Sequence, residues 1–234
     1  MNSPPVARGS QEAGFTQPRD HLIAHLCTQM GPNAKPLYAL EGSIAIAGAA
    51  VSWLRDMGFI AAPPEVEMLA GKAKDTGDVY FVPAFSGLYA PRWRPDARGA
   101  IVGLTQYSRK EHVCRAALEA VCFQTREILD AMDKDSGLRL ERVLVDGAMT
   151  GNDLMMQTLA DFLNISVVRP EMCEATSLGA AIAAGTAVGV WNKQGGKSES
   201  KTATFEPKMS AEEREAKYRK WNRAVEKSLG WTNK

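Results

Sequence analysis

The sequence predicts an α/β domain, and two observations carry this prediction. Short apolar runs rich in β-branched residues alternate along the chain with longer Ala-rich or amphipathic runs, as in folds whose strands are joined by helices. Residues 142–152 also pass from a strand pattern through a small-residue turn into a helical pattern. The 234 residues, 45% of them hydrophobic, are enough to bury a sizeable core.

Composition excludes some classes of partner. The net charge of +1 comes from acids and bases spread along the chain, so neither a nucleic-acid surface nor a polybasic membrane contact is indicated. The four cysteines show neither metal-ligand spacing nor a paired framework: Cys27, Cys114, Cys122 and Cys173. His21 and His25 have no third ligand nearby, so no metal site is expected. Without a hydrophobic signal segment or a membrane span, we expect a reduced, cytoplasmic protein.

The first half of the chain reads as a tail followed by alternating elements. Residues 1–21 are polar and aperiodic, so we expect a disordered tail. The elements expected next are a hairpin over residues 22–40, helices over 44–56 and 63–73, a strand over 79–82 and a loop over 83–98. In that loop, Phe85, Tyr89 and Trp93 either carry function or cover an edge of the core.

A long helix is the strongest pattern. It follows a strand over residues 99–104, and Ser108 with Glu111 matches a capping box at its start, with an end near Asp133. Its wide apolar stripe consists of Val113, Cys114, Ala117, Leu118, Val121, Cys122, Ile128 and Leu129. The residues expected off this stripe are Arg115, Glu119, Arg126 and Asp130. Gln124 and Thr125 interrupt it and are expected to make internal hydrogen bonds.

The second half continues the alternation. A helix over residues 154–163, a strand over 165–168, a buried small-residue helix over 178–190 and a polar surface loop over 192–204 are expected. A terminal amphipathic helix over residues 211–229 follows, with one apolar face made by Tyr218, Trp221, Val225 and Leu229.

The turn within residues 142–152 is the candidate ligand site. Ligands bind at the carboxyl ends of strands in α/β folds, and the first amides of the next helix can meet a phosphate or ribose. Gly147 and Ala148 would let the backbone approach a ligand closely. On its own, however, such a junction is more often purely structural.

Several separated motifs together resemble the carboxyl-terminal domain of glycerol kinases, within the FGGY family of carbohydrate kinases. The resemblance covers the chain from about Leu22 to its end. The motifs lie at residues 38–42, 83–91, 97–99, 122–126 and 177–181, with the family signature at Gly99, Gly103, Leu104, His112, Val113, Ala116, Ala117, Leu118 and Glu119.

The resemblance implies a ribonuclease-H-like ATPase domain of the actin and hexokinase type, present once, with an amino-terminal partner domain missing. It places this domain at residues 22–191, followed by the polar loop and by a terminal helical segment at 205–234 that packs on the domain. It also implies ATP or ADP as ligand, with Mg²⁺. The residues that match nucleotide-binding positions are Gly48, Ser52, Ala148 and Asn152, and Gly147 of the same turn completes the expected site. Ala148 replaces a second Gly of the adenosine turn, and Ser52 replaces a longer polar side chain.

Other family features have no counterpart in this sequence, namely the first phosphate loop, the polyol-binding groups and the general-base Asp. Phosphoryl transfer requires a carboxylate near the attacking hydroxyl, so we assign no catalytic residue. The resemblance therefore implies a glycerol kinase chain that supplies the nucleotide-side domain, is inactive alone, and meets glycerol only if the other domain is supplied. The alternatives are a non-catalytic module that binds a nucleotide or associates with a full-length kinase, and part of a kinase for another polyol or sugar. The partners expected are a full-length kinase or another copy of the chain.

Overall fold

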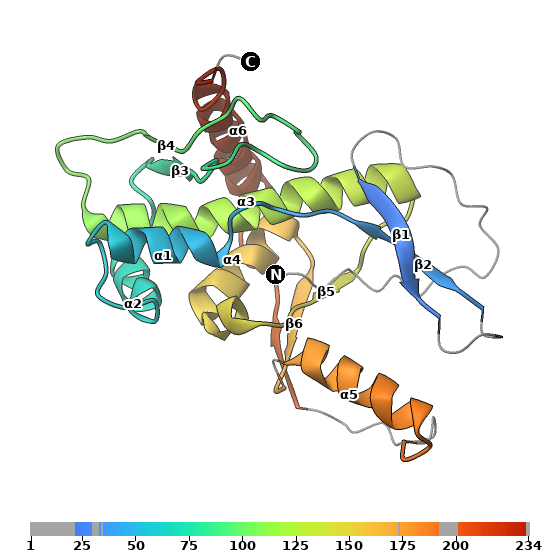
Figure 1. Ribbon diagram of the computed structural model, residues 1–234. Helices are drawn as coiled ribbons and strands as arrows, with labels where there is room; N and C mark the ends of the chain where they lie inside the picture. Colours follow the sequence, from blue (N-terminus) through green and yellow to red (C-terminus); the bar gives the residue numbers. More distant parts are fainter. Residues whose placement is uncertain (1–21, 30–32, 34, 173, 192–200, 233–234) are drawn as a thin grey trace.

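The computed structural model describes residues 22–29, 33, 35–172, 174–191 and 201–232 (Figure 1). The expected tail at residues 1–21, His21 and most of the expected polar loop lie outside this part of the chain. The elements are β1 (Ile23–Thr28), β2 (Leu37–Glu41), α1 (Gly48–Asp56), α2 (Glu65–Lys72), β3 (Tyr80–Val82), β4 (Ala100–Val102), α3 (Lys110–Ser136), β5 (Arg142–Leu144), the 3₁₀ turn η1 (Ala148–Gly151), α4 (Asp153–Leu163), β6 (Ser166–Pro170), α5 (Ala175–Ala187), β7 (Thr202–Phe205) and α6 (Ala211–Lys227). The predicted alternation of strands and helices is confirmed.

The described strands form three small sheets. β1 and β2 make the predicted antiparallel hairpin, and β3 pairs antiparallel with β4. In the third sheet β6 lies between β5, which is parallel to it, and β7, which is antiparallel. Residues 202–204, expected in a surface loop, therefore belong to a strand instead, because β7 pairs with β6 along its whole length.

The core is built around α3. Its predicted apolar stripe is confirmed, since all eight stripe residues are buried. Helices α1, α2, α4 and α6 pack around it, and Figure 1 shows α3 running through the middle of the molecule. At the hairpin end, Gly42 lies so close to α3 that a Cβ atom there would come 2.6 Å from Ile128 Cγ2. A larger residue at position 42 would therefore push β2 away from the core.

The two polar residues within the stripe of α3 make the internal hydrogen bonds that we expected. Gln124 Nε2 donates to the Ala120 carbonyl at 3.3 Å, and Thr125 Oγ1 donates to the Val121 carbonyl at 2.9 Å. Both bonds run one turn back along the helix.

The prediction for the start of α3 is wrong by one residue. Arg109, not Ser108, is the N-cap, and its backbone N–H donates to His112 Nδ1 at 3.0 Å. The Ser108 hydroxyl instead accepts from the Thr105 amide and closes the preceding turn. A His at the third helical position can accept this bond as Glu does, which the capping-box pattern overlooks.

Glu119 does not lie off the buried stripe of α3, as we expected, but is itself buried. Arg115 lies 3.3 Å from its carboxylate and Lys217 of α6 lies 3.6 Å away, so charged partners accompany it into the core. Burial raises the pKa of Glu119, while these two cations oppose that rise. The prediction failed because it considered α3 without α6, which covers this side of the helix.

Two further expectations need correction. The expected buried helix at residues 178–190 corresponds to α5, none of whose residues is buried. An Ala/Gly-rich run predicts a buried helix, but no neighbouring element of the described chain covers α5. The helix expected from residue 44 begins at Gly48, because Ala47 has non-helical backbone angles; it ends before Gly58, as predicted.

Candidate nucleotide site

The turn between β5 and α4 has a defined backbone that requires glycine at its start. Gly147 adopts φ 91° and ψ 167°, a region that other residues occupy only with strain. Thr150 then closes the turn, because its amide and its hydroxyl both donate to the Gly147 carbonyl, at 3.0 and 2.7 Å. Thr150 is fully buried, whereas Ala148 is exposed. Ala148 is thus exposed to solvent in a turn whose backbone is fixed by the hydrogen bonds of the buried Thr150.

The first amides of α4 are already bonded within the protein. Asn152 is the N-cap, and its side chain accepts from the Met155 amide at 2.8 Å. The Met156 amide donates to the Asn152 carbonyl, and the Leu154 amide donates to Glu67 Oε1 of α2 at 3.0 Å. The amides of Leu154, Met155 and Met156 thus have oxygen partners within the protein, and a nucleotide would have to displace these partners to bond them. Their contact with a nucleotide stays a prediction.

Arg169 holds this turn from the neighbouring strand β6. Its Nη1 donates to the Thr150 carbonyl and to Asp153 Oδ1, the latter at 2.8 Å. The guanidinium also lies 5.4 Å from the centre of the Phe205 ring. Sequence reasoning missed Arg169; the available signal was a cation directly after the strand expected over residues 165–168.

The start of α1 faces the same turn. A Cβ atom built on Gly48, the first residue of α1, would lie 3.8 Å from both Cγ and Sδ of Met149 in η1. Ser52 is half-buried one helical turn further along α1. The structure therefore brings Gly48 against the segment that holds Gly147, Ala148 and Asn152. Their roles in binding a nucleotide stay predictions.

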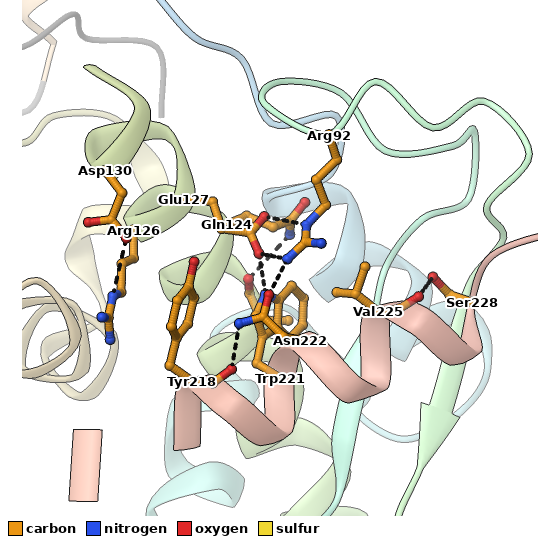
Figure 2. Close-up of polar contacts among 11 residues, drawn as sticks. Arg92, Gln124, Arg126, Glu127, Asp130, Tyr218, Trp221, Asn222, Val225 and Ser228 are labelled. Carbon is orange, nitrogen blue, oxygen red and sulfur yellow. Dashed lines mark hydrogen bonds and ion pairs between the residues drawn. The ribbon is translucent and has the colours of Figure 1, made fainter. Parts of the chain in front are cut away.

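A polar cluster between α3, α6 and the loop of residues 83–98 holds this loop in place (Figure 2). Arg92 of the loop donates from Nε to Glu127 Oε2 at 3.0 Å and from Nη2 to Glu127 Oε1 and Asn222 Oδ1, both at 2.5 Å. Trp221 Nε1 donates to Glu127 Oε1 at 2.6 Å. Because Glu127 is buried and bonded by two side chains, we interpret this cluster as structural.

The aromatic rings of the loop divide between the two roles left open by the sequence. Phe85 packs against Trp53 and Phe81, with ring centres 5.7 and 6.1 Å away, and so covers the core. Tyr89 and Trp93 are exposed and border a shallow hollow of about 330 Å³. No ligand chemistry follows from that hollow, since its walls are almost entirely apolar.

Within the described residues, no group of three His, Cys, Asp or Glu side chains is arranged to hold a metal ion. None of the helices in this part of the chain has the length and apolarity needed to cross a membrane.

The fold and the turn define an α/β domain. Its likeness to solved carbohydrate kinases gives it the fold class of actin-like and hexokinase-like kinases. Residues 11–188 match the model for the FGGY family of carbohydrate kinases, C-terminal domain. The chain belongs to this family, as its sequence motifs predicted.

The curated relatives most similar to this chain include glycerol kinases of bacteria. It is 54% identical to glycerol kinase of Pseudarthrobacter chlorophenolicus over 204 residues, which cover 86% of this chain and 40% of the relative. It is 55% identical to glycerol kinase 1 of Streptomyces avermitilis over 213 residues, or 90% of this chain and 41% of the relative. The chain thus spans about two fifths of the length of these relatives.

Solved structures support the same fold. The crystal structure of Plasmodium falciparum glycerol kinase with ADP matches with a TM-score of 0.80 and 44% identity, covering 89% of this chain and 42% of that one. A ligand-bound xylulose kinase from Lactobacillus acidophilus matches with a TM-score of 0.67 at 22% identity, over 88% of this chain and 41% of that one, and supports the fold alone.

Proposed function

We propose that this chain is the nucleotide-side domain of a glycerol kinase, which transfers the γ-phosphoryl group of ATP to glycerol and forms glycerol 3-phosphate. ATP or ADP would contact Gly48 and Ser52 of α1 and the turn that contains Gly147, Ala148 and Asn152. The similarity to glycerol kinases over nearly the whole chain supports the reaction class. An ADP-bound glycerol kinase of the same fold supports the ligand.

One observation carries the site assignment. Gly48 and Met149 come from segments about one hundred residues apart in the sequence, yet a Cβ atom on Gly48 would lie 3.8 Å from the Met149 side chain. The small residue at the start of α1 therefore leaves open the space beside η1. The four residues that the family resemblance assigned to a nucleotide, together with Gly147, lie on or next to these two segments.

Calorimetry with ADP and adenosine tests the site. We expect Gly48→Leu to abolish binding, because its side chain would extend into the space beside η1. Gly48→Ala is the matched control and should retain most of the affinity, since its Cβ would meet Met149 at an ordinary contact distance. Ala148→Gly should leave the affinity unchanged or improve it. Tight binding that survives Gly48→Leu would show that the nucleotide lies elsewhere.

An activity assay tests the reaction. We expect this chain alone to form no glycerol 3-phosphate from ATP, Mg²⁺ and glycerol, because we assign no general base within it. Adding the amino-terminal portion of a related glycerol kinase should produce activity that depends on both polypeptides. Activity of the chain alone would contradict the proposal. In the combined enzyme, Mg²⁺ would be held largely by the nucleotide phosphates, as is usual for this ion.

A non-catalytic module that pairs with another copy or with a full-length kinase is the second candidate. The exposed apolar helix α5 favours it, because such a surface is normally covered by a neighbour. A kinase for another polyol or sugar would appear in the same assay as activity with that substrate instead of glycerol. For location we propose the cytoplasm, which the free thiols of Cys114 and Cys122 support.

A further inference from the structure

We infer that Glu67 determines which end of a ligand the turn accepts, by excluding phosphate groups from the amino terminus of α4. This inference rests on the proposed function, in which a nucleotide binds at this turn. It assigns a specificity role to a residue of α2 that none of the family motifs described above includes.

The first argument is the position of the Glu67 carboxylate. Its Oε1 accepts a hydrogen bond from the Leu154 amide at 3.0 Å, across 87 residues of sequence. Leu154 is the second residue of α4, so the carboxylate sits where a bound phosphate oxygen would accept a bond from the helix. The protein thus supplies its own anion at this helix terminus.

The second argument is that α2 holds this carboxylate in place. Val66, Leu69 and Ala70 of α2 are buried in the core, and Glu67 lies between them in sequence with its own residue half-buried. The buried residues of α2 therefore fix its backbone beside α4, and the bond to the Leu154 amide holds the Glu67 side chain. An exposed, freely rotating glutamate would not keep an anion away from the amide.

The third argument is the charge of the surroundings. Asp153 at the first position of α4 adds a second carboxylate, and Arg169 lies 2.8 Å from it. The Arg169 guanidinium is also bonded to the Thr150 carbonyl, so its donors are directed at the turn itself. With two carboxylates against one engaged cation, a phosphate at this terminus would be repelled. An uncharged ribose or base would not be.

Two variants of Glu67 separate its charge from its hydrogen bond. Glu67→Gln retains an oxygen that can accept from the Leu154 amide but removes the charge, while Glu67→Ala removes both. Glu65→Gln is the matched control: Glu65 lies on the same helix, is also half-buried, and its Oε2 accepts from the Ala61 amide at 2.7 Å. The control changes the net charge equally, at a carboxylate that is bonded to the Ala61 amide instead of an amide of α4.

The decisive measurement is the backbone amide resonance of Leu154 in ¹⁵N-labelled full-length chain during titration with inorganic pyrophosphate. We expect no saturable shift in the wild type or in Glu65→Gln, and a saturable shift in Glu67→Ala. The spectrum itself reports whether each variant is folded. Saturation in the wild type, or no shift in folded Glu67→Ala, would overturn the inference.

Calorimetry extends the test to nucleotides. The wild type should bind adenosine and ATP with similar affinity, and Glu67→Gln should improve ATP relative to adenosine on the order of tenfold. A wild type that strongly prefers ATP, or an unchanged ratio in Glu67→Gln, would count against the inference. If no nucleoside binds any variant while the pyrophosphate results are as expected, the proposed function fails and phosphate exclusion by Glu67 stands.

Discussion

The contact between α3 and α6 and the surroundings of α5 represent opposite extremes of packing within one chain. Phe123 stacks on Phe162 and on Trp221, with ring centres 4.2 and 5.1 Å away. Next to these rings, the buried Glu127 carboxylate pairs with the partly exposed Arg92. By contrast α5, although poor in charge, has no buried residue, and Figure 1 shows it lying apart from α3.

This difference in packing predicts which substitutions affect the stability of the fold and which affect association with other molecules. The α3–α6 region buries large rings and contains a buried carboxylate with charged and polar partners, so substitutions there should lower the free energy of unfolding most. The turn beside α4 depends on a few backbone angles and should respond moderately. The surface of α5 contributes little to the folded state of this chain, so its substitution should change only contacts with other molecules.

The largest effect is expected for Trp221→Ala. Trp221 is 1% exposed, stacks on Phe123 and donates to Glu127, so its removal leaves a large cavity and a less well bonded carboxylate. We expect the free energy of unfolding to fall by about 4 kcal/mol in urea denaturation. Trp231→Ala, at a residue 65% exposed, should change it little. Equal effects of the two variants would show that the α3–α6 contact is not the stable part.

Arg92→Met should cause the second largest loss in the free energy of unfolding. It leaves the buried Glu127 carboxylate with Trp221 as its remaining side-chain donor, and we expect a loss of about 2–3 kcal/mol, somewhat less than for a fully buried pair because Arg92 is partly exposed. The control is Arg55→Met, whose ion pair with Asp56 is exposed and should contribute less than about 1 kcal/mol. Thermal and urea unfolding of both variants would check the order, and a smaller loss for Arg92 than for Arg55 would refute it.

Gly147→Ala probes the turn. No atom lies within 4 Å of a Cβ built on Gly147, so the cost comes from its backbone angles alone, about 1–3 kcal/mol. Gly151→Ala is the control in the same turn, because a Cβ there also has free space and its φ is not positive. We expect lower stability and weaker ADP binding for the first variant only. A stable Gly147→Ala protein would mean that the turn relaxes without strain.

The smallest effect on stability is expected on the α5 side. Val190→Ser replaces a side chain 80% exposed just after α5, so the free energy of unfolding should change by no more than about 0.5 kcal/mol. Light scattering at micromolar concentration should nevertheless show less self-association than in the wild type. If self-association is unchanged, or if the wild type is already monomeric, the surface at α5 does not mediate self-association.

Local sequence patterns predicted the elements well where each element buries one face. The stripe of α3, the hairpin and the strand-turn-helix at residues 142–152 follow from period and turn chemistry alone. The same patterns could not predict that Glu119 is buried, because Lys217 approaches it from a helix almost one hundred residues later. They also predicted wrongly that α5 is buried, since low polarity shows that a helix needs a neighbour but not that this chain provides one.

The candidate site, too, could be predicted only where it depends on local sequence. Gly147 could be assigned from its place in a turn, and the other four positions came from family resemblance. Glu67 and Arg169 were missed, because each acts through a bond to a backbone group distant in sequence. Such contacts depend on how helices and strands are placed, which no local pattern encodes.

The stacking of Trp53 gives the protein a built-in optical signal. Its ring lies 5.3 Å from that of Phe81 and 6.1 Å from that of Phe59, and it belongs to the same short helix as Gly48. Indole fluorescence responds to local polarity and to neighbouring rings, so a displacement of α1 should alter the emission of Trp53. With the other tryptophans replaced by phenylalanine where the fold permits, the movement of this helix could be followed in real time without any attached label.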